Sequence, residues 1–334
     1  MSDTIAEQPP YDLTLPSELA PIVRLFGWGM LGLLAAFTIN NILIVTQGHP
    51  GAMAVFSDFS AASLVDFGVY VICLLIAALY VQRTPTRALR LDALKIHHFN
   101  SYLIRACFWI VLFCGVVDAA IALGRVEDLL GTFFSPDTVS ALARAQFVGP
   151  YVHGPLILAG LVVAFFTRTL GFPWLALMIV AAELAIVISR FVFSYEQALM
   201  GDLVRYWYAA LFLFASAFTL FEEGHVRVDV LYAGFGKTTK GFCNAWGTIL
   251  LGMSTAWVII WIGFNGKTSI INSPVANFEV TQSGTTGMYI KYQMAAFIGI
   301  FAITMLIQFI SYFFESVADW RDQPGRRTLQ PVAH

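Results

Sequence analysis

The sequence has few charged residues: Asp, Glu, Lys and Arg make up 12% of its 334 residues, whereas 58% are hydrophobic. An ordinary soluble domain carries about twice that share of charge. The net charge of −2 at pH 7 leaves no basic excess, and a nucleic-acid-binding domain would need a basic face. The composition therefore argues against a typical soluble domain and against nucleic acid as a partner.

Cysteine is also scarce. The four cysteines lie inside or at the edge of apolar runs, and no two of them form a Cys-x-x-Cys pair. The sequence therefore predicts neither a metal centre nor a disulfide framework. Buried cysteine usually behaves as a small apolar side chain, and we expect that role here. The four residues are Cys73, Cys107, Cys114 and Cys243.

Long apolar runs dominate the sequence instead. A helix that crosses a membrane needs about 20 mostly apolar residues, because it spans about 30 Å at about 1.5 Å per residue. In lipid, a helix is the one open segment that satisfies its own backbone hydrogen bonds. The sequence therefore predicts an all-α, polytopic membrane bundle of about eight transmembrane helices. The predicted ranges are 22–45, 63–82, 101–124, 147–167, 173–193, 203–221, 243–264 and 293–314.

The Lys and Arg residues of the predicted loops are unevenly distributed. Most lie on the side that carries both ends of the chain, in loops such as 83–95 and 237–240. Because Lys and Arg in short loops face the cytoplasm, both termini are expected to be cytoplasmic. Residues 1–21 lack the basic start of a cleavable signal peptide, so we expect them, like 321–334, to form a cytoplasmic tail.

Three short motifs follow one another in the second half of the sequence. The fifth predicted helix ends in Arg190-Phe-Val-Phe, and the sixth carries Arg205 and Tyr206 near its start. After the sixth helix comes His225-Val-Arg-Val-Asp-Val-Leu. In this order and spacing, residues of about 170–320 resemble the small permease subunit of tripartite ATP-independent periplasmic (TRAP) transporters, the DctQ family.

Two positions depart from the family pattern. Asp202 stands where the family has paired acidic residues, and Ser194 stands where it has an asparagine after the Arg-Phe-Val-Phe element. The contact that the paired acids would make is therefore not carried over to this chain.

The resemblance implies a scaffold role without catalysis. Such a chain would be the small membrane subunit of a secondary transporter that imports an organic anion, such as a carboxylate, across the bacterial inner (cytoplasmic) membrane. Its partners would be a large permease subunit (DctM-like) that carries the substrate and ion sites, a periplasmic substrate-binding protein (DctP-like), and membrane lipids. No enzyme activity and no cofactor are implied.

The first half of the sequence lies outside the resemblance. A predicted four-helix membrane region at 22–168 precedes the DctQ-like membrane domain at 169–320. The basic loop predicted at 87–99 contains Arg-Leu-Asp-Ala-Leu at 90–94, which mirrors Arg-Val-Asp-Val-Leu at 227–231. The first half is therefore either a diverged second copy of the same module or an unrelated extension.

Two sets of charged residues are candidates for structural and docking roles. The first set holds the helix ends and the cytoplasmic connection, and comprises Arg190, Arg205, Glu222, Glu223, His225, Arg227 and Asp229. The second set is a candidate periplasmic docking surface, and comprises Glu196, Asp202, Lys267, Glu279 and Lys291. Alternatively, the charges at 190–205 form a local ion-pair network that stabilises two helices only slightly in water.

A few polar residues fall inside the apolar runs. Glu183 lies near the centre of the fifth predicted helix, where an isolated charge is costly. It either belongs to an ion path, or is protonated or paired with a polar group on a neighbouring helix or on the large subunit. Asp66 and Asp118 are expected near the periplasmic ends, within reach of water. Arg24 and Arg105 are expected to extend to the cytoplasmic boundary.

Two other functions remain open. A membrane redox or cytochrome-like subunit would need two histidines at similar depth to ligate haem, but among the histidines only His153 falls clearly within a predicted span. A Soret band in the absorption spectrum would favour that function. A self-sufficient carrier is the other alternative, and uptake by this chain alone in vesicles would favour it.

Overall fold

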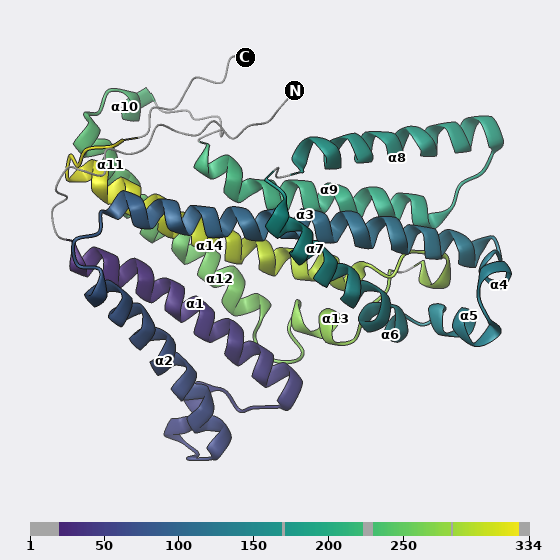
Figure 1. Ribbon diagram of the computed structural model, residues 1–334, viewed down its shortest axis with the longest axis horizontal. Helices are drawn as coiled ribbons and strands as arrows, with labels where there is room; N and C mark the ends of the chain where they lie inside the picture. The colour runs from purple at the N-terminus through teal and green to yellow at the C-terminus, as the bar shows by residue number, and fades with distance from the viewer. Residues whose placement is uncertain (1–19, 169–170, 223–229, 282, 327–334) are drawn as a thin grey trace. The chain divides into compact units, whose positions relative to one another are not determined.

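The computed structural model describes residues 20–168, 171–222, 230–281 and 283–326, in which all regular structure is helical (Figure 1). Eight helical segments of this part of the chain are long and apolar enough to cross a membrane, which confirms the predicted fold class. They are Pro21–Gln47 (α1), Ala61–Arg83 (α2), Leu89–Val126 (α3), Ala145–Phe166 (α6, η2 and α7), Phe172–Phe193 (α8), Ala198–Phe221 (α9), Lys237–Gly263 (α11, η3 and α12) and Lys291–Trp320 (α14).

Two of these spans contain a π-helical turn. The first joins α6 (Ala145–Val148), η2 (Gly149–His153) and α7 (Gly154–Phe166). The second joins α11 (Lys237–Gly247), η3 (Thr248–Met253) and α12 (Ser254–Gly263). The shorter helices are η1 (Ala52–Phe56), α4 (Leu130–Phe133), α5 (Pro136–Leu142), α10 (Val230–Ala233), α13 (Asn272–Ala276) and η4 (Gly284–Thr286).

Local sequence signals set the ends of the first spans. Pro21 occupies the first turn of α1, where the N–H that proline lacks would have no helical partner. Gly48 ends α1 in the left-handed region, at φ 75°, and donates its N–H to Ile44 O at 3.2 Å. Ser60 caps α2 by accepting the N–H of Ser63.

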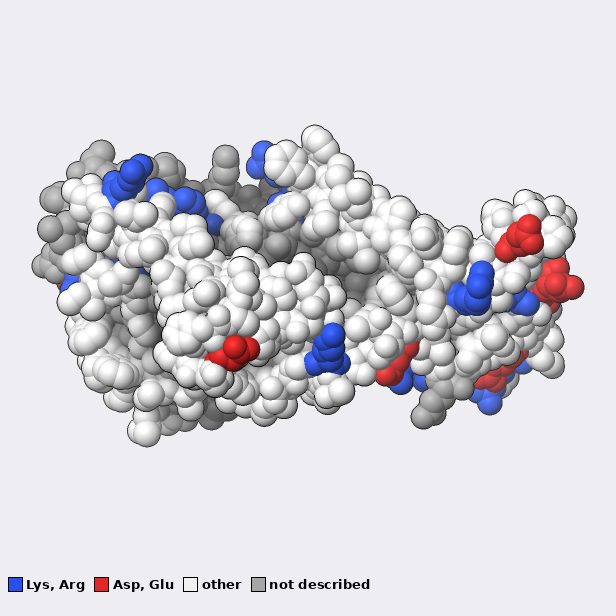
Figure 2. All heavy atoms as spheres, turned by 90° about the horizontal axis from the view of Figure 1, so that it is seen from below, with Lys and Arg blue, Asp and Glu red and all other residues white. Residues whose placement is uncertain are grey.

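The exterior is largely uncharged. In Figure 2, the Lys, Arg, Asp and Glu residues occupy a few spots on the face shown, and most of that face carries none. Large apolar side chains point outward along the spans, for example Ile76 on α2 and Phe165 on α7. Soluble monomers rarely expose apolar surface of this extent, whereas lipid covers it.

The chain forms two compact units. Unit 1 comprises the described residues up to Asn100, together with 217–268 and those from Ala302 onward. Unit 2 comprises 101–216 and 269–301. Helices α3, α9 and α14 contribute residues to both units. Each unit therefore draws on both halves of the sequence.

Helix α3 begins earlier than the sequence predicts. The stretch 87–99, expected to be a loop, is helical from Leu89 onward. Its residues Leu89, Ala93 and Ile96 are buried at helical spacing, although the charged and histidine residues between them hide this pattern. Ser311 of α14 donates its hydroxyl to Ala93 O at 2.8 Å, so α14 packs against this first part of α3 in unit 1.

Helices α11 and α14 approach each other closely at Gly241. A Cβ atom at this position would lie 2.3 Å from the backbone nitrogen of Trp320, which cannot move aside as a side chain could. We expect Gly241→Ala to lower the free energy of unfolding by about 1–3 kcal/mol through overpacking. Gly247→Ala is the control, because nothing lies within 4 Å of its Cβ position. Equal effects of the two substitutions in an SDS titration of mixed micelles would contradict this packing.

Candidate functional site

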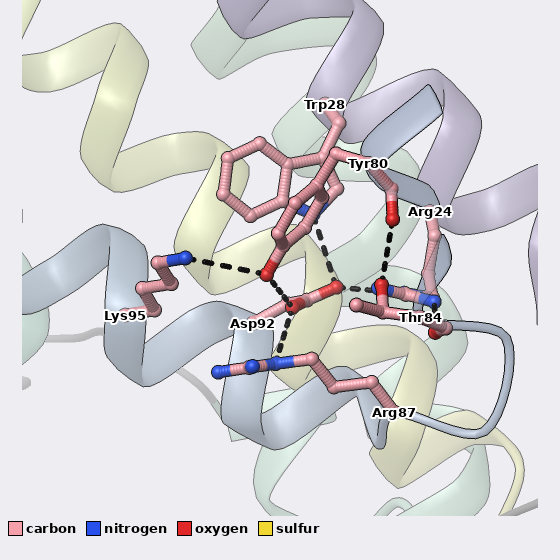
Figure 3. Close-up of polar contacts among 7 residues, drawn as sticks. All are labelled: Arg24, Trp28, Tyr80, Thr84, Arg87, Asp92 and Lys95. Atoms are coloured by element: carbon pink, nitrogen blue, oxygen red, sulfur yellow. Dashed lines mark hydrogen bonds and ion pairs between the residues drawn. The ribbon is translucent and has the colours of Figure 1, made fainter. Parts of the chain in front are cut away.

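In unit 1, a buried carboxylate joins α1 to α3. Asp92 lies in the first turn of α3 and is fully buried. Its Oδ2 atom accepts hydrogen bonds from Arg24 Nε at 2.7 Å and from Trp28 Nε1 at 3.0 Å (Figure 3). Because Arg24 and Trp28 both belong to α1, this single carboxylate fixes the first two turns of α1 against α3.

Further contacts extend this group to α2. The Arg24 guanidinium donates to the backbone oxygen of Thr84 and, at 2.7 Å, to Thr84 Oγ1. Tyr80 donates its hydroxyl to Asp92 Oδ1 at 3.4 Å, and Arg87 Nε lies 2.9 Å from the same oxygen. We call the seven residues drawn in Figure 3 the Asp92 cluster: Arg24, Trp28, Tyr80, Thr84, Arg87, Asp92 and Lys95.

The position of Arg24 corrects an expectation. Arg24 does not extend into the surroundings of the chain, because its side chain is 1% exposed. A guanidinium carries five donors, and here a carboxylate and two oxygens of Thr84 accept from it. Burial of a charge is tolerated when the charge is paired and hydrogen-bonded in this way. Arg105 is only half-buried, and it donates to the backbone oxygen of Arg168 at 3.4 Å.

Arg90 makes a further ion pair in unit 1. It donates to Asp319 Oδ1 at 2.8 Å, and to the backbone oxygens of Gln323 and Pro324 at 2.9 Å each. These bonds hold the C-terminal end of α14 against the start of α3. The two charged residues of Arg-Leu-Asp-Ala-Leu, Arg90 and Asp92, therefore bind different helices.

Asp66 is also buried, contrary to the expectation that water reaches it. Its Oδ1 atom lies 2.7 Å from His49 Nδ1, and its Oδ2 atom accepts the N–H of Gly51 at 2.9 Å. The connection between α1 and α2, which includes η1, packs on α2 and shields this carboxylate. The burial of Asp66 could not be predicted from its position along α2, because the segment that shields it is the connection between two helices.

In unit 2, Asp118 of α3 holds the segment that leads into α14. Its Oδ2 atom accepts the backbone N–H of Tyr289 at 2.6 Å. Its Oδ1 atom lies 3.4 Å from Nε2 of His153, and neither of these atoms has a hydrogen-bond partner among the described residues. Asp118 and His153 are fully buried, so the expectation that water reaches Asp118 was wrong. Its partner segment lies about 170 residues further along the chain, where sequence spacing carries no signal.

A chain of hydrogen bonds continues from His153. Its Nδ1 atom lies 2.8 Å from the hydroxyl of Tyr292, and Gln293 Nε2 donates to the same hydroxyl at 3.0 Å. Tyr206 of α9 in turn donates to Gln293 Oε1. We call Asp118, His153, Tyr206, Tyr292 and Gln293 the Asp118 cluster. It joins α3, η2, α9 and α14 within unit 2.

Tyr289 lies beside the Asp118 cluster, and the guanidinium of Arg125 lies over its ring. The Arg125 guanidinium carbon is 3.8 Å from the centre of the Tyr289 ring, and its nitrogens donate to Leu142 O and Gly287 O. Burial raises the pKa of the Tyr289 hydroxyl; Arg125 opposes this, while the Asp118 carboxylate adds to it. The hydroxyl therefore stays protonated and donates to Ala143 O at 2.8 Å.

Asp202, a candidate docking residue, is buried rather than exposed. Its Oδ2 atom accepts the N–H of Met288 at 3.1 Å and the hydroxyl of Thr281 at 3.2 Å. Arg205, by contrast, is exposed, and its guanidinium lies 3.7 Å from Asp202 Oδ1. Asp202 thus anchors the segment before α14 from within unit 2.

The other candidate docking residues of unit 2 form exposed ion pairs. Lys291 Nζ lies 2.8 Å from Glu279 Oε2, and Arg190 Nε lies 3.5 Å from Glu196 Oε2. Lys267 is exposed and belongs to unit 1. Such pairs stabilise a fold by about 1 kcal/mol or less, so their charges remain available to a partner.

The motif after α9 falls largely outside the described residues. Glu223, His225, Arg227 and Asp229 lie outside them, so their roles remain predictions. Glu222 lies just past the end of α9 and is exposed; its N–H is bonded to Phe218 O at 3.0 Å.

Glu183 lies in the middle of α8 and is exposed. Among the described residues, no hydrogen-bond or ion-pair partner contacts its carboxyl group. The described helices of this chain therefore do not satisfy this carboxyl group.

The fold and its polar clusters define an all-helical, multi-pass membrane protein. Comparison with protein families identifies residues 177–319 as a match to "Tripartite ATP-independent periplasmic transporters, DctQ component". The chain thus carries a TRAP transporter small-permease domain over these residues, as the motifs predicted. The helices before this domain form an N-terminal extension. No curated protein and no solved structure matches the chain.

Proposed function

We propose that this chain is the small membrane subunit of a TRAP-type secondary transporter in the bacterial inner membrane. It would support a large permease subunit and dock a periplasmic binding protein, and so assist the import of an organic anion such as a carboxylate. The observation that carries the proposal is the DctQ match over residues 177–319, which takes in the last four membrane spans apart from a few residues at their ends.

The internal polar contacts favour a fixed scaffold over a moving transport domain. A carrier usually binds its substrate at broken helices near the membrane midplane. In the described part of this chain, each membrane span is continuous, two of them through a π-helical turn. Asp92 and Asp118 bind other elements of their own unit. These side chains hold helices together instead of lining a site for an anion.

The test of this proposal is assembly with a large permease subunit. The tagged chain, co-expressed with the permease subunit of the same transporter, should retain that subunit through purification in a mild detergent. A matched preparation of an unrelated eight-span membrane protein with the same tag is the control. Elution of this chain alone, with uptake activity of its own, would favour the self-sufficient carrier.

The proposed orientation places both termini in the cytoplasm. We expect Lys237→Cys, at the start of α11, to react with a membrane-impermeant maleimide only after cells are permeabilised. Asn265→Cys, in the exposed connection after α12, should react in intact cells. Both substitutions are made in a variant without the native cysteines. The opposite labelling pattern would overturn the orientation.

The proposed docking surface includes the exposed pair of Glu279 and Lys291. Lys291→Glu would place two carboxylates side by side, and we expect it to weaken binding of the periplasmic protein to the complex about two- to fivefold. Arg326→Glu is the control, because Arg326 also pairs with an acidic residue, Asp319, but lies on the proposed cytoplasmic side. Surface plasmon resonance at two salt concentrations measures both. Equal loss in the two variants would argue against docking at Lys291.

A further inference from the structure

Helix α8 is the least buried of the eight membrane spans. Of its 22 residues, only Leu175 and Ile179 are buried within the chain. The remaining surface is apolar, and lipid can cover apolar surface without any partner. The exposure of α8 alone therefore does not indicate a docking site.

Glu183 is the residue that lipid cannot satisfy. It is the twelfth of 22 residues in α8, so its Cα lies about 15 Å along the helix axis from either end. A glutamate side chain is too short to reach the membrane boundary from there, unlike the long Lys and Arg side chains that do so near helix ends. A polar side chain at this depth generally faces a protein partner.

The neighbours of Glu183 define a face that is suited to a helix. Val180 and Val187 lie three residues before it and four residues after it, so the three side chains share one side of α8. Both valines are exposed, and β-branched side chains lose little freedom when a helix packs on them. Ile179, one turn before Glu183, is buried. The face therefore lies beside the side of α8 that packs on the rest of the chain through Leu175 and Ile179.

Charge complementarity distinguishes between two possible partners of this α8 face. A second copy of this chain, related by a two-fold axis, would bring equivalent residues together and place two Glu183 carboxyl groups near each other. A helix that carries a hydrogen-bond donor, such as Lys, Arg, Asn or Ser, complements the carboxyl group instead.

We propose that the α8 face formed by Val180, Glu183 and Val187 docks a helix of the large permease subunit that presents a hydrogen-bond-donating side chain at mid-membrane depth. The inference rests on the proposed function and deepens it. Glu183 is then a positioning residue of the assembly and takes no part in an ion path.

Photo-crosslinking tests where the partner lies. Benzoylphenylalanine in place of Val187 should crosslink this chain to the co-expressed large subunit. The same group in place of Ala185, which is exposed and lies two residues before Val187 on the other side of α8, should not. A crosslink to a second copy of this chain, or to lipid alone, from position 187 would overturn the proposal.

Substitution of Glu183 tests the hydrogen bond. Glu183→Leu should lower the large subunit retained during purification about three- to tenfold, the range of a single intramembrane hydrogen bond. Glu183→Gln keeps a hydrogen-bonding group and should retain most of the large subunit, while Ala185→Leu, on the other side of α8, should have no effect. The thermal stability of the isolated chain should not fall in Glu183→Leu, since no described residue of the chain pairs or hydrogen-bonds with the carboxyl group.

The outcomes separate the two proposals. If the wild-type chain retains the large subunit and Glu183→Leu retains as much, the inference about α8 fails and the proposed function stands. If the wild-type chain retains none, both fail.

Discussion

Asp92→Ala should destabilise the chain by about 3–5 kcal/mol, the largest effect that we expect from a single substitution. The substitution leaves the Arg24 guanidinium buried without its carboxylate, and it removes the acceptor of Trp28 Nε1. A buried charge without a partner costs far more than an exposed one, because the protein interior solvates it poorly. An SDS titration of the purified chain in mixed micelles measures the change.

Two further variants show whether the uncompensated charge is the cause. Arg87→Ala removes the more exposed ion-pair partner of Asp92 and should cost about 1 kcal/mol or less. Arg24→Met combined with Asp92→Leu removes both buried charges and should recover much of the stability lost in Asp92→Ala. A double variant as unstable as Asp92→Ala would show that packing, and not charge, determines the effect.

Asp118→Ala should destabilise the chain by about 3 kcal/mol, the second largest effect. The buried N–H of Tyr289 loses its acceptor, and an unsatisfied buried donor costs about 1–3 kcal/mol. The cavity left by the side chain and the loss of the carboxylate beside His153 add to this cost. Because Tyr289 lies two residues before α14 and loses its acceptor, protection of its amide from hydrogen exchange should fall as well.

Asp118→Asn and Glu279→Gln are the controls for this prediction. Asparagine can still accept the N–H of Tyr289, so Asp118→Asn should retain more stability than Asp118→Ala. Glu279→Gln weakens an exposed pair with Lys291 and should change stability by about 1 kcal/mol or less. Similar losses in Glu279→Gln and Asp118→Ala would contradict the burial of Asp118.

The membrane spans could be predicted from the sequence because lipid imposes a length and a composition on them. The start of α3 could not be predicted from the sequence. Its first four turns contain Arg90, Asp92, His97 and Asn100, which are typical of a loop at a membrane boundary. They are buried because other helices supply their partners, for example Thr304 O, which accepts from Asn100 Nδ2 at 3.0 Å. Hydropathy does not reveal such partners.

The candidate site residues also include some that the sequence predicted and some that it did not. The order of the motifs around Arg190 and Arg205 predicted the DctQ domain, because short motifs at fixed spacing are visible along the chain. The burial of Asp66, Asp118 and Asp202 was not predicted. Each accepts a backbone N–H from another segment, and which backbone group meets a side chain depends on tertiary packing.

Transport by a reconstituted system tests the central proposal most directly. Proteoliposomes that contain the large permease subunit, supplied with the periplasmic binding protein and a labelled organic acid that it binds, are compared with and without this chain. We expect rapid uptake only when the chain is present, and none by the chain alone. Full uptake without the chain, or uptake by the chain alone, would contradict its role as the small subunit.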